Sequence, residues 1–387
     1  MAEPKVRFKR DDGSSYPDWT TMPMSEVFTE IAEKNHPEMQ VLSVQQGVGT
    51  VLRESSDRNI LYDKSNLKGY KAMRKDDFII HLRSFEGGLE CSNYDGISSP
   101  AYRILRSNKL LSSAFKDYFR SYAFIHNKLA VSVVGIRDGK NIDMDTFWQI
   151  PMTIPCVEEQ QEIADFLFSV DEVIAASTEE VANLETQKQA VMKMIFSQKV
   201  RFKRMDGSDF PKWEEKLLSD VSECLDNQRV PINSTERAKI VGEIPYYGAG
   251  SIQGYINKFL FDEDLVLLLE DGDAFDDFKT KSISQFVKGK CWINNHAHVL
   301  RPLEDPFFLH CALSHKDIRA WTQLAGQSRK KLTQENMLKI TLDMPCLEEQ
   351  RLIANFLSDF DEAIMTAKRE LELWKELKKG LLQQMFV

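Results

Sequence analysis

The sequence lacks several features that would place a protein in a familiar class. Its apolar runs fall short of the roughly 18 residues that a membrane helix needs, and we find neither a signal peptide nor a lipidation motif. Its six cysteines are widely spaced without a CxxC pair, so they give no sign of a disulfide framework or a zinc site. A GxxxxGK[ST] phosphate-binding loop is also missing. We therefore expect a soluble, cytoplasmic protein with reduced cysteines and no metal ion.

A large excess of positive charge is missing as well. The net charge is −9, of which residues 149–199 carry −6 and residues 214–338 carry −4, whereas residues 20–148 sum to +1. A near-neutral segment can still present a basic face, because phosphate is attracted by the local field. A nucleic-acid partner would thus depend on local clusters of lysine and arginine, and the acidity of residues 214–338 counts against binding by charge alone.

What the sequence does contain is an internal repeat. KVRFKR occurs at residues 5–10 and again at 199–204, and PCVEEQ at 155–160 is matched by PCLEEQ at 345–350. The segments between these blocks resemble each other only faintly. Repeated units normally adopt one structure and are related by symmetry, so we expect a pseudo-two-fold axis within one chain.

The repeat continues across the ends of the chain. Met385 and Phe386 match Ile195 and Phe196, which lead into the second KVRFKR. Joining the last residue to Lys5 would therefore close a ring of two equal halves. We expect the two termini to lie close together.

A long helix follows each PC-EEQ block. Apolar residues recur there at alternating spacings of four and three, which predicts two helices that pack along a coiled-coil seam. Glu-Glu in the first turn suits the helix dipole, and Lys188 and Lys378 interrupt the seam at equivalent positions. At 1.5 Å per residue, about 38 residues would span on the order of 57 Å. The predicted seam consists of Ile163, Leu167, Val170, Ile174, Val181, Leu184, Val191 and Ile195, paired antiparallel with Ile353, Leu357, Phe360, Ile364, Leu371, Trp374, Leu381 and Met385.

The two variable segments show a mixed α/β pattern. Leu265 to Leu269 reads as a buried strand after a glycine-rich turn region, and residues 78–84 occupy the same place in the first segment. KVRFKR is predicted to be an opening strand with its valine and phenylalanine turned inward, or else a docking segment for a partner.

In this order and register, these pieces resemble the specificity subunit of type I restriction-modification systems. The resemblance rests on the doubled PxxEEQxxIAxFLxxxD pattern, on IPYYGAGSIQGYI at 244–256, on NNHAHVLRP at 294–302 and on the KLT at 331–333. It implies an α+β fold with two target-recognition domains and a pair of long antiparallel helices. The implied domains are residues 1–150 and 199–340, and the implied spacer helices are residues 151–198 and 341–387.

The resemblance also implies a function. Each domain would read one half of a bipartite, asymmetric double-stranded DNA site in the major groove, while the helices set the spacing and dock two modification subunits. Restriction subunits would join that complex. S-adenosylmethionine, ATP and Mg²⁺ are expected on those partner subunits and not on this chain, which also lacks the NPP[FY] tetrapeptide of adenine methyltransferases. The chain itself is expected to be non-catalytic and without contact to a membrane.

Candidate DNA contacts are basic or amide side chains in loops and at strand ends. Such side chains can neutralise phosphates or read base edges, although a solvated loop or a turn that satisfies its own backbone has the same appearance. His296 and His298, two apart on an expected strand, would face one side, but the spacing supplies no further metal ligand. The candidates are Lys68, Lys71, Arg74, Arg83, Ser84, Arg137, Lys140, Asn294, Asn295, His296, Arg329, Lys330 and Lys331.

Two other classes of function remain open at this point. The chain could be an assembly scaffold that holds two protein partners without touching DNA. It could also be a nuclease that uses Glu270, Asp271 and Asp273 to hold Mg²⁺, although neighbouring acids usually form a solvated turn. Sequence-selective DNA binding would exclude the scaffold, and nicking by the chain alone would be needed to support the nuclease.

Overall fold

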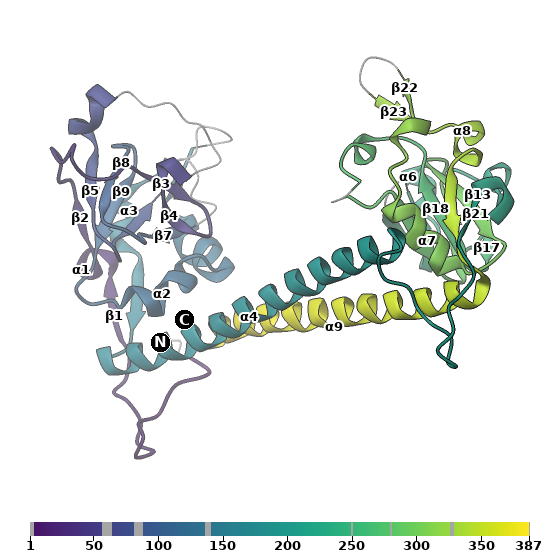
Figure 1. Cartoon of the computed structure of the whole chain (residues 1–387). Helices are drawn as coiled ribbons and strands as arrows, with labels where there is room; N and C mark the ends of the chain where they lie inside the picture. Colours follow the sequence, from purple (N-terminus) through teal and green to yellow (C-terminus); the bar gives the residue numbers. More distant parts are fainter. Residues whose placement is uncertain are drawn as a thin grey trace. The chain divides into compact units, whose positions relative to one another are not determined.

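The computed structural model describes residues 4–55, 64–80, 88–135, 141–248, 251–278, 281–325 and 329–386. The chain forms two compact units (Figure 1). Unit 1 comprises residues 1–178 and 369–387, and unit 2 comprises residues 179–368. Among the helices described, none is both long enough and apolar enough to cross a membrane.

Unit 1 is built around a four-stranded antiparallel sheet in the order β2-β9-β6-β7. Its α/β part begins with β1 (Thr20–Pro23) and ends with β12 (Pro151–Ile154), which pair antiparallel with each other. The other elements are α1 (Met24–Val27), β2 (Thr29–Ile31), β3 (Leu42–Gln45), β4 (Gly49–Leu52), β5 (Lys71–Met73), β6 (Phe78–Ile80), β7 (Leu89–Cys91), β8 (Gly96–Ser98), β9 (Arg103–Arg106), α2 (Ser112–Phe119), β10 (Val133–Val134), β11 (Asn141–Ile142) and α3 (Met144–Gln149).

Unit 2 repeats this plan. Its central antiparallel sheet has the order β14-β21-β18-β19, and β13 (Glu214–Leu217) pairs with β24 (Thr341–Met344) as β1 does with β12. A second sheet, β16-β15-β20-β17, has no counterpart of the same order among the described sheets of unit 1. The other elements are α5 (Leu218–Val221), β14 (Ser222–Cys224), α6 (Ser234–Arg237), β15 (Val241–Tyr247), β16 (Ile252–Ile256), β17 (Phe261–Asp262), β18 (Leu265–Leu269), β19 (Ser284–Val287), β20 (Lys290–Ile293), β21 (Ala297–Pro302), α7 (Pro306–His315), β22 (Gln323–Ala325), β23 (Arg329–Lys331) and α8 (Gln334–Leu338).

Local sequence explains the central elements of unit 2. All five residues of β18 are buried, which is why the strand is a continuous apolar run without alternation. The helix α7 begins where Asp305 accepts a hydrogen bond from Phe308 N and Pro306 occupies the first turn, a favoured arrangement at a helix start. The apolar face of α7 then packs on β18 and β19, and Phe308 and Leu309 belong to the core.

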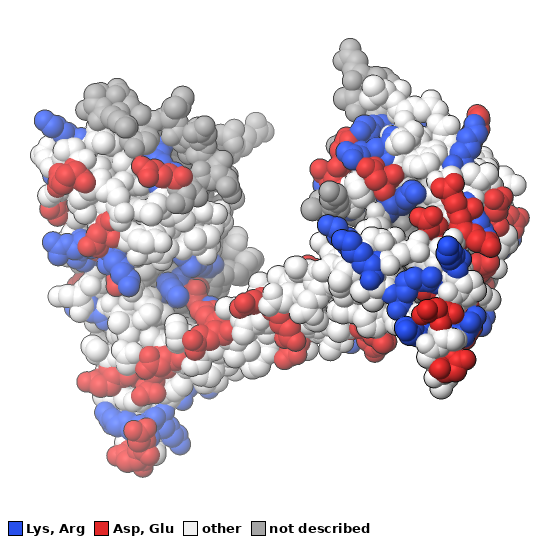
Figure 2. Space-filling view, viewed as in Figure 1, with Lys and Arg blue, Asp and Glu red and all other residues white. Residues whose placement is uncertain are grey.

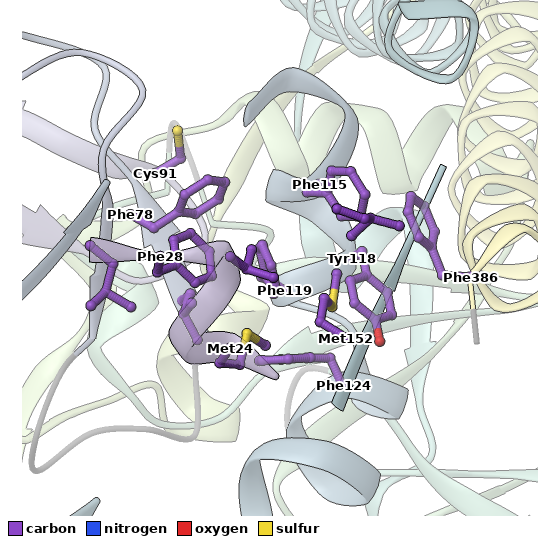
Figure 3. Packing of buried hydrophobic residues seen from close by; sticks show 14 of the residues in the cluster. Met24, Phe28, Phe78, Cys91, Phe115, Tyr118, Phe119, Phe124, Met152 and Phe386 are labelled. Carbon is purple, nitrogen blue, oxygen red and sulfur yellow. The ribbon is translucent and has the colours of Figure 1, made fainter. Parts of the chain in front are cut away.

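The core of unit 1 is rich in aromatic side chains. Phe28, Phe78 and Phe119 meet edge to face or tilted with ring centroids 5.0 to 5.9 Å apart, in the range where such pairs add to the stability from burial. Phe386, near the end of the chain, stacks on Tyr118 at 4.7 Å and meets Phe115 at 5.2 Å (Figure 3). Met385 and Phe386 are thus part of the core of unit 1.

The helices α4 (Val157–Phe196) and α9 (Leu347–Met385) are the two long helices that the heptad pattern predicted. They pair antiparallel. Lys188 on α4 contacts Asp361 on α9 within unit 2, and Asp171 on α4 contacts Lys378 on α9 within unit 1. Residue numbers therefore fall along one helix as they rise along the other. The predicted fold class, with two mixed α/β parts and two long helices, is confirmed.

Each seam residue named above is buried or half-buried. The ends of the seam also contribute to the cores of the α/β parts: Ile163 and Leu167 pack in unit 1, and Ile353 and Leu357 pack in unit 2. The same apolar stripe therefore serves both the helix pair and the adjoining sheet domain.

The described residues near the two ends of the chain meet, as predicted (Figure 1). Lys5 N donates to Gln384 O at 2.8 Å, and in the other copy Lys199 N donates to Met194 O at 3.0 Å. These are equivalent residues of the repeat. In unit 2 the two residues lie on one continuous stretch of chain, whereas in unit 1 the same contact joins residues near the two ends of the chain.

The prediction for KVRFKR is partly wrong. Val6 and Val200 are 37% and 50% exposed, while Phe8 and Phe202 point inward and meet Phe166 and Phe356 at 5.6 Å. Neither segment is a strand, since only isolated bridges at Lys9 and Lys203 occur. Side chains and the helix end hold these segments, so no alternating ladder turns the valines inward.

Candidate nucleic-acid interface

The most regular site in the molecule is a buried glutamate that occurs twice. Glu159 accepts hydrogen bonds from Arg7 Nε and Nη2 at 3.1 and 2.8 Å and from Trp19 Nε1 at 3.0 Å. Glu349 accepts the same three bonds from Arg201 and Trp213 at 3.1, 2.7 and 3.1 Å. Both carboxylates are completely buried. Bidentate pairing with arginine is the geometry that compensates such burial.

The neighbouring glutamine completes this arrangement. Gln160 Nε2 donates to Pro155 O at 3.1 Å and to Lys109 O at 2.9 Å, and its Oε1 accepts from Leu111 N at 2.7 Å. Gln350 Nε2 likewise donates to Pro345 O at 2.9 Å. The E-Q pair of each repeat therefore fixes the start of the long helix to its sheet domain. These residues build the scaffold on which a site is placed.

In unit 1, three of the predicted contacts lie within the described residues. Lys68 and Arg74 are exposed. Lys71 is half-buried in β5 and donates from Nζ to Tyr102 O at 2.7 Å, and burial lowers the pKa of its ammonium. Arg83, Ser84, Arg137 and Lys140 lie outside the described residues.

In unit 2, residues 294–296 form the turn between β20 and β21. Asn295 and His296 are exposed, and Asn294 N donates to Tyr247 O at 3.0 Å. The Oδ1 atom of Asn294 is buried and has no hydrogen-bond partner within the described part of the chain. Because β21 begins at Ala297, the expectation that both histidines face one side is wrong: His296 lies in the turn, and His298 is buried.

His298 joins several segments behind this turn. Its Nδ1 lies 2.6 Å from Asp226 Oδ2 and its Nε2 lies 2.9 Å from Leu332 O. Asp226 also accepts from Val299 N at 2.8 Å, and although burial raises the pKa of Asp226, the hydrogen bond from His298 leads the contributions that lower it overall. Both ring nitrogens are thus occupied by protein acceptors. The ring holds together the strand, the turn after β14 and the residue that follows β23.

The basic strand β23 is paired with acidic residues. Lys330 forms an ion pair with Asp276, and Lys331 Nζ lies 3.1 Å from Glu270 Oε1. Glu270 is also bound by Arg229 Nη1 at 2.8 Å; burial raises the pKa of Glu270, but the hydrogen bonds from Arg229 and Lys331 lower it overall. Figure 2 shows this intermingling of both signs over unit 2. The backbone of Arg329 belongs to β23, and its side chain is outside the described residues.

Of the carboxylates considered for a nuclease, that of Glu270 is engaged by basic side chains, and Asp271 Oδ2 lies 3.8 Å from His296 Nδ1. Glu270 serves the arginine and lysine just named, and Asp271 forms a backbone bridge with Lys331. Within the described ranges, no group of three or more His, Cys, Asp and Glu side chains could hold a metal ion.

Sequence reasoning missed the Arg7-Trp19-Glu159 site and the His298 centre. The first left a signal, since Arg7, Trp19 and Glu159 all recur in the second copy while the segments between them diverge. The second left none, because Asp226 and Leu332 are far from His298 in sequence and only the strand register brings them together.

Comparison with known proteins agrees with this duplicated architecture. The family model of the type I restriction modification DNA specificity domain matches twice, over residues 17–186 and 211–373. The chain belongs to this family.

Individual relatives cover different shares of the chain. A Haemophilus influenzae protein designated as a candidate type I restriction enzyme specificity subunit is 36% identical over 157 residues, which are 40% of this chain and 38% of that protein. The specificity subunit of the MjaVIII type I restriction enzyme of Methanocaldococcus jannaschii is 24% identical over 51% of this chain and 47% of its own length. The chain thus matches less than half the length of these two relatives.

Solved structures show the same fold over the whole chain. The crystal structure of the S subunit of a type I restriction-modification system from M. genitalium covers 100% of this chain and 99% of its own, with a TM-score of 0.61 and 15% identity. A structure described for complex assembly and conformational transition of the type I restriction-modification system covers 96% of this chain and 98% of its own, with a TM-score of 0.57 and 17% identity.

Proposed function

We propose that this protein is the DNA specificity subunit of a type I restriction-modification complex and is not itself a catalyst. The observation that carries this proposal is the family model, which matches each half of the chain separately. In this proposal residues 1–150 and 199–340 are the recognition domains, and each reads one half of a bipartite site. Residues 151–198 and 341–387 supply the helix pair that sets the distance between the half-sites.

Within unit 2, the candidate contacts gather around one corner of the central sheet. The turn of residues 294–296 precedes β21, and β23 is bridged to the residue after Glu270, which itself follows β18. Loops at one edge of a rigid sheet are suited to carry binding residues. Exposed Asn295 and His296 can offer hydrogen bonds to base edges, and Lys330 and Lys331 can contact phosphates.

The expected partners are two modification subunits, joined by restriction subunits. Exposed residues that are the same in both copies support a partner that binds twice. Lys5 and its equivalent Lys199 are exposed, and so are Val6 and its equivalent Val200. Exposed side chains are free to differ between the copies, so their identity supports a shared partner. Val157 and Leu347, at the first position of the long helices, are 65% and 37% exposed. These lie two residues before the buried glutamates that anchor KVRFKR.

The test is to map modified adenines in a host that carries the modification subunits, with and without this chain. We expect methylation of one bipartite sequence that depends on the chain, and a purified complex that binds this sequence with strong salt dependence. Chain-dependent assembly without any sequence preference would instead support the scaffold function. Nicking of DNA by the chain alone with Mg²⁺ would support the nuclease.

A further inference from the structure

Lys378 connects three elements of unit 1. Its Nζ lies 2.6 Å from Asp171 Oδ1 on α4 and 2.6 Å from Asp117 Oδ2 on α2. The side chains of Lys378 and Asp117 are only 16% and 14% exposed. A lysine of the helix seam therefore reaches an acid of the α/β part as well as an acid of the partner helix.

The charges continue from Asp117 into the sheet. Asp117 Oδ1 lies 3.8 Å from Arg120 Nη1, and Arg120 donates to Glu90 Oε2 on β7 from Nη2 and Nε at 2.6 and 2.9 Å. Glu90, 1% exposed, also accepts from Gly47 N at 2.7 Å in the turn between β3 and β4. An uninterrupted series of charged contacts thus links that turn to the helix pair.

Unit 2 differs from unit 1 at the equivalent positions. Lys188 pairs with Asp361 across the helices at 2.5 Å, but the position of Asp117 is occupied by His310. The equivalence follows from Phe115 and Phe308, each two residues earlier, which meet Phe386 and Phe196 at 5.2 and 5.8 Å. His310 Nδ1 lies 3.0 Å from Ser284 Oγ, and burial, with a smaller contribution from Lys188, lowers its pKa to about 4. Among the described residues, Lys188 thus pairs with the acid of the partner helix and with no acid of the α/β part.

We infer that Lys378 is a positioning residue that, through Asp117, fixes the angle at which the recognition domain of unit 1 is held on the helix pair. The burial of apolar surface holds the two together but is not itself directional. A partly buried ion pair adds direction, because any arrangement that separates the two charges leaves them uncompensated. The inference rests on the proposed function, because that angle matters when a domain must meet its half-site at a set distance from the other.

The experiment uses the full chain assembled with its modification subunits and DNA duplexes in which the two mapped half-sites are separated by the native gap or by one or two base pairs more or fewer. Asp117→Asn keeps the shape of the side chain and removes the charge that faces Lys378. We expect the preference for the native gap over its neighbours to fall by about tenfold, the ratio that corresponds to roughly 1.4 kcal/mol, with the base preference of each half-site unchanged.

Glu372→Gln is the matched control. It makes the same chemical change on α9 and removes only the pair with Lys375, which lies three residues away on the same helix, so the gap preference should stay at the wild-type value. If Asp117→Asn folds poorly, Lys378→Met is the second variant and Lys378→Arg, which keeps the charge, should restore the preference. A folded Asp117→Asn or Lys378→Met complex with wild-type gap preference would overturn the inference. Wild-type complex without any bipartite preference would overturn the proposed function itself.

Discussion

At the scale of single residues, the buried glutamate that occurs in both copies should contribute strongly to the free energy of unfolding. Glu159→Gln removes the charge that Arg7 pairs with in a completely buried place. Because breaking a buried ion pair leaves its partner uncompensated, and Arg7 is partly exposed, we expect a loss of about 2 to 4 kcal/mol in the free energy of unfolding of unit 1. Denaturant titration of the full chain measures it.

The neighbouring residue provides the control for this prediction. Glu158 is exposed in the first turn of the same helix, so Glu158→Gln should change the free energy of unfolding by no more than about 0.5 kcal/mol. Equal effects of the two substitutions would show that the buried pair has no special weight.

His310 gives the stability of unit 2 a dependence on pH. Its pKa is about 4 in the folded chain and about 6.5 when unfolded. Between these values the unfolded chain binds a proton that the folded chain does not, so the free energy of unfolding falls as the pH falls from about 6.5 to about 4. The stabilisation that comes from keeping His310 neutral is fully present above about pH 6.5.

We expect this histidine to account for about 1 to 3 kcal/mol, allowing for the partial exposure of the residue. The fall in the free energy of unfolding between pH 7.0 and pH 4.5 should therefore be smaller for His310→Gln than for the wild type, as measured by denaturant titration at both pH values. His315, whose pKa is also lowered by burial, remains in both proteins and cancels in the comparison. Parallel losses in the two proteins would contradict the assignment.

The lysines of β23 are expected to act on DNA through their charge. Replacing Lys330 and Lys331 with alanine should weaken binding and reduce the slope of log affinity against log salt by about one to two. The reduction should stay below two if Asp276 and Glu270 must first be displaced. Fluorescence anisotropy over a series of salt concentrations measures both quantities.

Two variants frame this measurement. Asp276→Asn removes the acid that competes for Lys330 and should strengthen binding, while Lys368→Ala removes a pair with Glu185 between the helices and should leave both affinity and slope unchanged. Unaltered DNA affinity in the double alanine variant would remove β23 from the interface, and assembly with the modification subunits should persist in every case.

Individual side-chain roles were only partly predictable from the sequence. Lysine and arginine in a loop indicate capacity to bind phosphate, but the acids that pair with Lys330 and Lys331 lie 54 and 61 residues earlier in the chain. The burial of His298 likewise depends on the register between β18 and β21. Such contacts between distant segments leave no pattern in the neighbouring sequence.

At the scale of elements, the paired helices were the most predictable part because a heptad is a local pattern. The contacts of Lys188 and Lys378 add the register that the pattern did not supply. Asp171 lies opposite Lys378, and the helices are antiparallel. Six residues further along α4 and six residues back along α9, Ser177 therefore lies opposite Glu372. KVRFKR shows the opposite case, since its alternation of apolar residues resembles a strand while its conformation is set by Arg7 and the helix end.

This register allows a matched lengthening of both helices. Inserting seven residues after Ser177 and seven after Glu372 keeps the Lys378 and Lys188 pairs in place. Seven residues add about 10 Å of helix, which corresponds to about three base pairs at 3.4 Å each. We expect the gap in the recognised site to grow by about that number with both half-sites unchanged, as read from the positions of modified adenines.

Insertion in α4 alone is the control for this prediction. It shifts the lysine pairs out of register and should lower the free energy of unfolding without giving a defined longer gap. A matched insertion that leaves the gap at its original length would mean that the helices do not set the spacing.

At the scale of the whole molecule, the meeting of the chain ends predicts a permuted protein. Residues 387 and 1–4 provide five positions between Phe386 and Lys5, where the other copy uses Ser197 and Gln198 alone. A chain that begins at Lys199, runs through a direct junction of residue 387 to residue 1 and ends at Gln198 should therefore fold into the same two units. Circular dichroism and the methylation pattern should match those of the original order.

A second permuted chain with the same junction, but opened between β18 and β19, is the control. Its new ends separate two strands that pair within one sheet, and this should prevent folding of unit 2. A permuted chain from Lys199 that fails in the same way would contradict the ring.

The strands β1 and β12 lie side by side, as do β13 and β24, so the polypeptide enters and leaves each sheet domain at neighbouring points. Genetic recombination between related genes can therefore replace everything between such a strand pair while the buried glutamate, its arginine and the long helices stay in place. Two crossovers that flank such a segment would, on the proposed function, change one recognised half-site without prior adjustment of the buried contacts that hold the helices.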